Sequence, residues 1–174
     1  MAGVEMPISP CKGTLAITVL VAENLFRCKA MPSTDYLDTV RSDNTNSIVV
    51  ATNLQQEKNC NFLLGSSRQF VGFDSIVDLN VISMVLSRTL RFFPFIARIT
   101  VLRAWVGFRL SSPDLLPIIL PVESIDGMYI AARHEGIGIT ETPIKGKLIS
   151  QLITGQQPEI PSDELMLSRC QQVV

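Results

Sequence analysis

Short runs of apolar and β-branched residues, separated by polar turns, fill the first part of the chain. Strand character is predicted for residues 13–22, 36–40, 47–52 and 62–66. The segments between the last three are polar and rich in residues that favour turns. Three short strands with polar turns indicate an antiparallel meander.

The spacing of apolar residues then changes to three and four, which is typical of one face of a helix. We expect a first helix to begin at Asp78, whose carboxylate can cap it, and to end before Pro94. Residues 98–108 return to strand character, a proline-rich loop follows at 111–121, and 128–132 form another short strand.

A second helix is predicted after a glycine-containing loop at residues 133–140. Its apolar positions lie between Ile144 and Ile153, Pro143 suits its first turn, and Gly155 is expected at its C′ position. The whole pattern predicts an α+β fold with an antiparallel sheet of about five or six strands, one covering helix and a C-terminal strand–helix unit.

The composition excludes several classes of protein. Hydrophobic residues make up 47 % of the chain and charged residues 18 %, which is enough apolar material for a core. The net charge of −1 argues against a nucleic-acid binder. No apolar run approaches the roughly 20 residues of a membrane span, and residues 1–13 lack the apolar core of an export signal. We expect a cytoplasmic protein.

The cysteine and histidine content gives no metal or redox motif. No CxxC pair occurs, and His134 is the sole histidine, so a multi-histidine metal site is excluded and no metal is expected. Reduced thiols are expected at all four cysteines: Cys11, Cys28, Cys60 and Cys170.

The strand–loop–helix segment at residues 128–155 is one candidate site. A glycine loop that enters a helix presents unpaired backbone N–H groups at the positive end of the helix dipole. Such a site suits an anion or an electron-rich ring edge. An ordinary strand–helix turn would show the same local pattern, so both interpretations stay open.

A second candidate is a strand face at residues 103–109. Alternation places Arg103, Trp105, Gly107 and Arg109 on one face. Two arginines and an indole on one face can hold a carboxylate and form a wall of its pocket. The alternative is a solvated face at the edge of a sheet.

Several separated segments together resemble the FAD-dependent amine and D-amino-acid oxidoreductases, a group with glycine oxidase, sarcosine oxidase-like enzymes and hydrogen cyanide synthase-type dehydrogenases. The resemblance covers residues 9–155. It is carried by residues 10–15 (PCKGTL), 68–74 (RQFVGFD), 103–109 (RAWVGFR), 111–119 (SSPDLLPII) and 128–155 (MYIAARHEGIGITETPIKGKLISQLITG).

The resemblance implies that the chain is the C-terminal half of such an enzyme. Residues 9–125 would form the substrate-binding antiparallel sheet region, residues 126–155 the C-terminal piece of the FAD-binding domain, and residues 156–174 a loose tail. The family's N-terminal dinucleotide-binding unit, with its G-x-G-x-x-G turn, is expected to be missing from this chain.

Site residues follow from the same resemblance. Arg109 matches the arginine that pairs with the substrate carboxylate, with Trp105 beside it as a second substrate-binding residue. The activity implied is oxidation of the C–N bond of an amino acid or secondary amine by hydride transfer to FAD, and no catalytic residue is assigned. The residues expected to contact FAD are His134, Glu135, Gly136, Ile137, Gly138, Ile139 and Thr140.

The chain departs from the family pattern at four positions. Arg133 and Leu120 replace glycines, Leu110 replaces a proline, and Thr142 replaces an alanine. Bulky residues at glycine positions conflict with a positive φ or with close approach of a cofactor. Two alternatives therefore accompany the enzyme interpretation: a truncated, non-catalytic fragment without FAD, and a subunit whose partner supplies the FAD domain. Separately, we expect a homodimer, a partner subunit or aggregation to cover the apolar surface left exposed by the missing domain.

Overall fold

The computed structural model describes residues 3–162, except 5, 22–29, 33–47, 113, 115, 123 and 134–137, and it also describes residue 165. The chain divides into two compact units, one at Pro10–Arg109 and one formed by Met1–Ser9 with Leu110–Val174. The strands are β1 (Ser9–Thr18), β2 (Ala30–Pro32), β3 (Val49–Gln56), β4 (Phe62–Arg68), β5 (Val101–Ser111), β6 (Ile118–Pro121) and β7 (Tyr129–Ala132), and the helices are α2 (Leu79–Phe92), the 3₁₀ helix η1 (Pro94–Arg98) and α3 (Gly138–Ile153).

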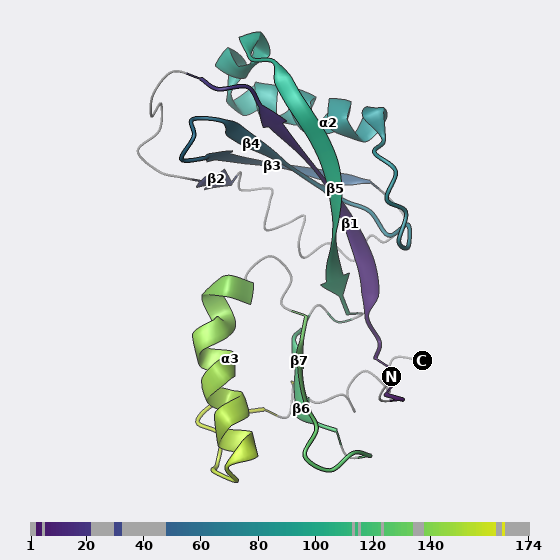
Figure 1. Ribbon diagram of the computed structural model, residues 1–174, viewed down its shortest axis with the longest axis vertical. Coiled ribbons are helices and arrows are strands. Elements are labelled where there is room, and N and C mark those ends of the chain that lie inside the picture. Colours follow the sequence, from purple (N-terminus) through teal and green to yellow (C-terminus); the bar gives the residue numbers. More distant parts are fainter. Residues whose placement is uncertain are drawn as a thin grey trace. The chain divides into compact units, whose positions relative to one another are not determined.

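The unit Pro10–Arg109 is built on a five-stranded sheet in the order β2-β3-β4-β1-β5. The pairs β2–β3, β3–β4 and β4–β1 are antiparallel, and the register places Leu15 opposite Gly65 and Leu54 opposite Leu64. Figure 1 shows β5 running beside β1 in the opposite direction. The α+β class with an antiparallel sheet is therefore confirmed.

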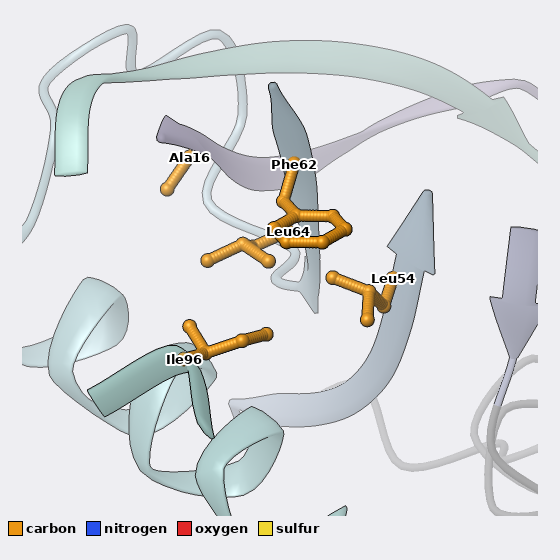
Figure 2. Close-up of a cluster of buried hydrophobic side chains, with 5 residues drawn as sticks. All are labelled: Ala16, Leu54, Phe62, Leu64 and Ile96. Carbon is orange, nitrogen blue, oxygen red and sulfur yellow. The ribbon is translucent and has the colours of Figure 1, made fainter. Parts of the chain in front are cut away.

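One face of this sheet is covered by α2, which packs against β3 and β4. The core beneath it is a cluster of side chains that point toward one another (Figure 2). Each fully buried leucine or phenylalanine contributes about 1.5–3 kcal/mol to folding. The cluster comprises Ala16, Leu54, Phe62, Leu64 and Ile96.

Both predicted ends of the first helix are confirmed. The carboxylate of Asp78 accepts a hydrogen bond from the Asn80 N–H at 2.8 Å, which satisfies one of the unpaired donors of the first turn. At the other end the Phe93 N–H donates to the Thr89 carbonyl, and Pro94 then begins η1. The short helix η1 delays the next strand, so β5 begins at Val101 and not at residue 98.

The second unit contains the two-stranded antiparallel ribbon β6–β7, against which α3 packs. Its apolar cluster is centred on Ile118 and Val122. The interpretation of residues 111–121 as a loop was wrong at its end, because Ile118–Pro121 form β6. Pro121 lacks an N–H donor, but β6 is an edge strand of the two-stranded ribbon, where proline is tolerated.

Helix α3 begins earlier than the sequence suggested. The loop expected at residues 133–140 ends before Gly138, so Gly138, Ile139 and Thr140 form the first turn of the helix. Pro143 is consequently inside the helix and not in its first turn. At the other end, Gly155 has a φ of +67° and closes the helix at the expected C′ position.

The predicted strand at residues 36–40 and two of the four predicted thiols cannot be compared with the structure, because they lie outside the described residues. The strand predicted at residues 36–40 lies outside the described residues, and the three-residue strand β2 was not predicted. Cys11 and Cys60 are free thiols, whereas Cys28 and Cys170 lie outside the described residues. Among the helices that the structure describes, none is long and apolar enough to cross a membrane.

Candidate functional site

The basic residues singled out in the sequence lie on β5, an edge strand of the five-stranded sheet. Positions 103, 105 and 109 are in phase along the strand, but burial does not alternate strictly, because both Val101 and Ala104 pack against the core cluster. Trp105 and Arg109 are half-buried, and Arg103 is exposed. The common face of these three side chains stays a prediction from their spacing along the strand.

The spacing along β5 corrects one part of the hypothesis. Six residues separate Arg103 from Arg109 in a continuous strand, which corresponds to about 20 Å at a rise of about 3.3 Å per residue. Two guanidinium groups so far apart at their backbones cannot hold the same small carboxylate. Trp105 is about 13 Å from Arg109 by the same measure, so its indole can form only a more distant wall.

Arg109 lies over the neighbouring strand at Gly13. Its Nη2 atom is 3.5 Å from the place where a Cβ on Gly13 would be. Sequence reasoning did not single out Gly13, although a glycine inside a strand often marks a close approach of another group. A Cβ at position 13 would be in van der Waals contact with the guanidinium, and a longer side chain would compete with it for space.

Lys12, the residue before Gly13, is a buried cation with a different role. It is 2 % exposed, and its Nζ donates hydrogen bonds to Asp74 Oδ2 at 2.8 Å and to the Ile76 carbonyl at 2.6 Å. The hydrogen bond from Lys12 holds the pKa of the Asp74 carboxyl below its ordinary value. Lys12 anchors the segment that leads into α2, so Arg109 is the better candidate for an external carboxylate.

The second candidate site is described only in part. His134, Glu135, Gly136 and Ile137 lie outside the described residues. Gly138, Ile139 and Thr140 form the first turn of α3, and the Ile139 side chain is 94 % exposed. The N–H groups of a first helical turn have no partner within the helix, so this end can receive the edge of a large polar ring.

Arg133 immediately precedes the undescribed loop and has an unusual backbone. Its φ is +59°, in the left-handed region that favours glycine, and its side chain is 3 % exposed. The resemblance places a glycine at this position. The conflict expected between a bulky residue and a positive φ is therefore present in the structure.

Solved structures with the same architecture carry the titles of an oxidase and a dehydrogenase. The L-proline dehydrogenase from P. horikoshii matches with a TM-score of 0.78 and 21 % identity, covering 98 % of this chain and 42 % of that chain. The glycine oxidase from Geobacillus kaustophilus matches with a TM-score of 0.74 and 20 % identity, covering 96 % and 40 %. These similarities establish that this chain has the fold of the matching parts of those two structures.

The sequence comparisons define the family. The family model described as FAD dependent oxidoreductase matches residues 1–152, and this chain belongs to that family. The hydrogen cyanide synthase subunit HcnC of Pseudomonas protegens is 28 % identical over 87 % of this chain, and the glycine oxidase of Pseudomonas putida is 26 % identical over 91 %. The chain spans 32 % and 38 % of the lengths of these two relatives.

Proposed function

We propose that this chain is the substrate-binding part of an FAD-dependent oxidoreductase that oxidises the C–N bond of an amino acid or secondary amine. The observation that carries the proposal is the half-buried Arg109 of β5, which lies over Gly13. A cation supported in this way, in a chain of this family, suits a substrate with a carboxylate next to its amine.

Arg109 has the geometry to orient such a substrate. A guanidinium can donate two parallel N–H···O bonds to one carboxylate, which fixes both the position and the rotation of the bound molecule. Trp105, further along the same face of β5, would form a wall of the pocket. Orientation of the α-carbon is the contribution that we assign to these two residues.

The start of α3 fits the flavin that the family implies. Residues 134–140 would line the ring, and the described part of that segment, Gly138–Thr140, is a first helical turn, whose N–H groups have no partner within the helix. The bound cofactor would supply the acceptor for the hydride of the substrate α-carbon. The positive end of the α3 dipole would stabilise negative charge on the reduced ring.

The assignment of regions follows from these roles. We propose that residues 9–125 form the substrate-binding region, that residues 126–155 form the C-terminal piece of the flavin domain, and that residues 156–174 form a tail. The tight turn G-x-G-x-x-G does not occur in the 174 residues. The pyrophosphate of FAD would therefore be held by a dinucleotide-binding region that this sequence does not contain.

That region can be supplied by a partner chain, and one relative is itself named as a subunit. Expression with and without the neighbouring reading frames tests this proposal. The chain alone is expected to be colourless and to associate with itself or another protein, whereas a complex with a dinucleotide-binding partner is expected to show the visible absorption of a flavin. One tightly bound flavin per chain, in the absence of a partner, would contradict the proposal.

The substrate role is tested in a fusion of this chain to the dinucleotide-binding region of a relative. Arg109→Lys should reduce kcat/KM for an amino acid by about ten- to a hundredfold, because one charge-assisted hydrogen bond contributes about 1.5–3 kcal/mol. Arg103→Lys is the matched control on the same face and should change kcat/KM much less. The loss should be absent for the matching amine without a carboxylate, and equal losses with both substrates would refute the assignment of Arg109.

A further inference from the structure

Gly13 is a glycine inside a strand, and its backbone does not require one. It lies within β1, is buried, and has none of the positive φ values found at Gly3, Gly72, Gly127 and Gly155. A strand-interior glycine that is not needed for its backbone angles calls for another explanation, and close approach of a neighbouring group is the usual one.

The surroundings of Gly13 supply that explanation. A Cβ at this position would be 3.3 Å from the Ser67 carbonyl oxygen, 3.5 Å from Arg109 Nη2 and 4.0 Å from the Gly107 carbonyl oxygen. These groups come from β4 and β5, the two neighbours of β1 in the sheet (Figure 1). The side chain of Arg109 therefore reaches across bare backbone at Gly13.

The backbone of β4 next to Gly13 is held in place by burial and a hydrogen bond. Ser67 is 1 % exposed, and its hydroxyl accepts a hydrogen bond from the Thr14 N–H at 3.0 Å. A methyl group at Gly13 would be crowded by the Ser67 carbonyl, and relief would come through movement toward Arg109, whose side chain is longer and more flexible. A β-branched side chain would have to fill the space that Nη2 occupies.

We propose that Gly13 is a positioning residue for Arg109, and that its missing side chain sets where the guanidinium meets the carboxylate of the substrate. This inference rests on the proposed function, since it assumes that Arg109 binds a carboxylate. Gly13 itself touches no substrate. It acts by leaving a place on β1 in which the guanidinium can lie.

Gly107 offers a matched control. It is two residues before Arg109 on the same strand, it is exposed, and a Cβ there would meet nothing within 4 Å. The variants are Gly13→Ala, Gly13→Val and Gly107→Ala. Each is titrated with sodium acetate against sodium chloride at equal ionic strength, and the Nε–Hε resonance of Arg109, assigned by its loss in Arg109→Lys, reports binding in the chain as it is.

We expect Gly13→Val to move the Arg109 resonance in the free protein and to weaken acetate binding by about tenfold or more, and Gly13→Ala to weaken it by about two- to fivefold. Gly107→Ala should leave both readouts unchanged. If Gly13→Val does not fold, the position of the Arg109 resonance and its response to acetate in Gly13→Ala, compared with those in Gly107→Ala, decide the question.

The outcomes separate this inference from the proposed function. A normal Arg109 response to acetate in both Gly13 variants would overturn the role of Gly13 and leave the substrate site intact. An equal loss in Gly107→Ala would also overturn it, since crowding of the face would then explain the effect. No Arg109 response to acetate in the unchanged chain would instead refute the carboxylate site itself.

Discussion

The strands β4 and β6 are both buried, but they are buried in different ways. In β4 the core residues Phe62 and Leu64 lie beneath α2, while Leu63 between them is only half-buried. In β6, Ile118 and Ile119 are adjacent and both are fully buried, so both faces of the ribbon are covered. The run Phe62–Leu64 of β4 therefore has a half-buried apolar residue at its centre, whereas the apolar neighbours in β6 are both removed from water, as in strands covered on both faces.

The two helices differ in a corresponding manner. Helix α2 has a side-chain cap at Asp78 and lies over a broad sheet, and its buried residues are Val81, Val85 and Thr89. Helix α3 contains a proline and buries Leu148 together with the polar side chains of Lys145 and Gln151. In α2 the capping residue and the packing against the sheet both favour a helix. In α3 the proline disfavours a helix, so the stability of this helix depends more on its packing.

The largest effect is expected in the core of the five-stranded sheet. Phe62 is fully buried and contacts Phe95 edge to face at 5.9 Å. Phe62→Ala should lower the free energy of unfolding by about 3–5 kcal/mol, because a buried cavity replaces the ring. Phe73→Ala is the control, since Phe73 is 76 % exposed, and urea denaturation of both variants makes the measurement. Equal losses would show that this core does not dominate stability.

A stabilising change is expected in α3. Proline at position 143 cannot donate the N–H that would bond to the Ile139 carbonyl one turn earlier. Pro143→Ala should raise the stability of the unit that contains α3 by up to about 3 kcal/mol. Hydrogen exchange of the amides in α3 measures the gain, with the amides of α2 as the internal reference. Unchanged protection in α3 would mean that the proline fits the helix without cost.

A smaller effect isolates the strain at Arg133. Arg133→Gly and Arg133→Ala both remove the buried side chain, but only glycine adopts a φ of +59° freely. The glycine variant should therefore be more stable than the alanine variant by about 1–2 kcal/mol in thermal unfolding. Comparison between the two variants cancels the contacts of the arginine. Equal stabilities would show that the backbone relaxes to a negative φ when the side chain is lost.

The smallest effect concerns the cap of α2. Asp78→Ala should cost about 1 kcal/mol, because the Asn80 N–H loses its acceptor. Asp78→Asn keeps a side-chain oxygen at the same place and should retain most of the stability. Chemical denaturation of the three proteins compares them. A loss in Asp78→Asn as large as that in Asp78→Ala would assign the effect to charge and not to the hydrogen bond.

An element was predicted correctly from the sequence where its local residue signals and its packing in the fold favour the same structure. The ends of α2 were predictable because Asp78 and Pro94 act within a few residues. The strand β6 was missed because its apolar residues do not alternate and stand between two prolines. The extent of α3 was underestimated because Gly138 and Pro143, which usually lie outside helices, both fall within it.

The candidate site was predictable along one strand but not between strands. Alternation predicts one face of β5 for Arg103, Trp105 and Arg109. The six-position spacing of the two arginines was already enough to exclude one small ligand held by both. The pattern did not show the approach of Arg109 to Gly13, because that contact depends on β1 and β5 being neighbours in the sheet.

Because β1 and β5 are neighbours in the sheet, the unit Pro10–Arg109 is expected to tolerate changes in the length of its turns. The stretch Pro10–Arg109 is continuous, and it begins on β1 and ends on β5, strands that run side by side in opposite directions (Figure 1). Its two ends therefore lie close together, as they do in domains that tolerate insertion into a host sequence. The turns within such an inserted unit can lengthen, shorten or be exchanged while its first and last residues keep their positions. Once this unit is folded, it acts as a short connection between Met1–Ser9 and the residues from Leu110 onward, which together form the other unit. The entropy cost of closing a loop of that length therefore no longer opposes the packing of these two segments against each other.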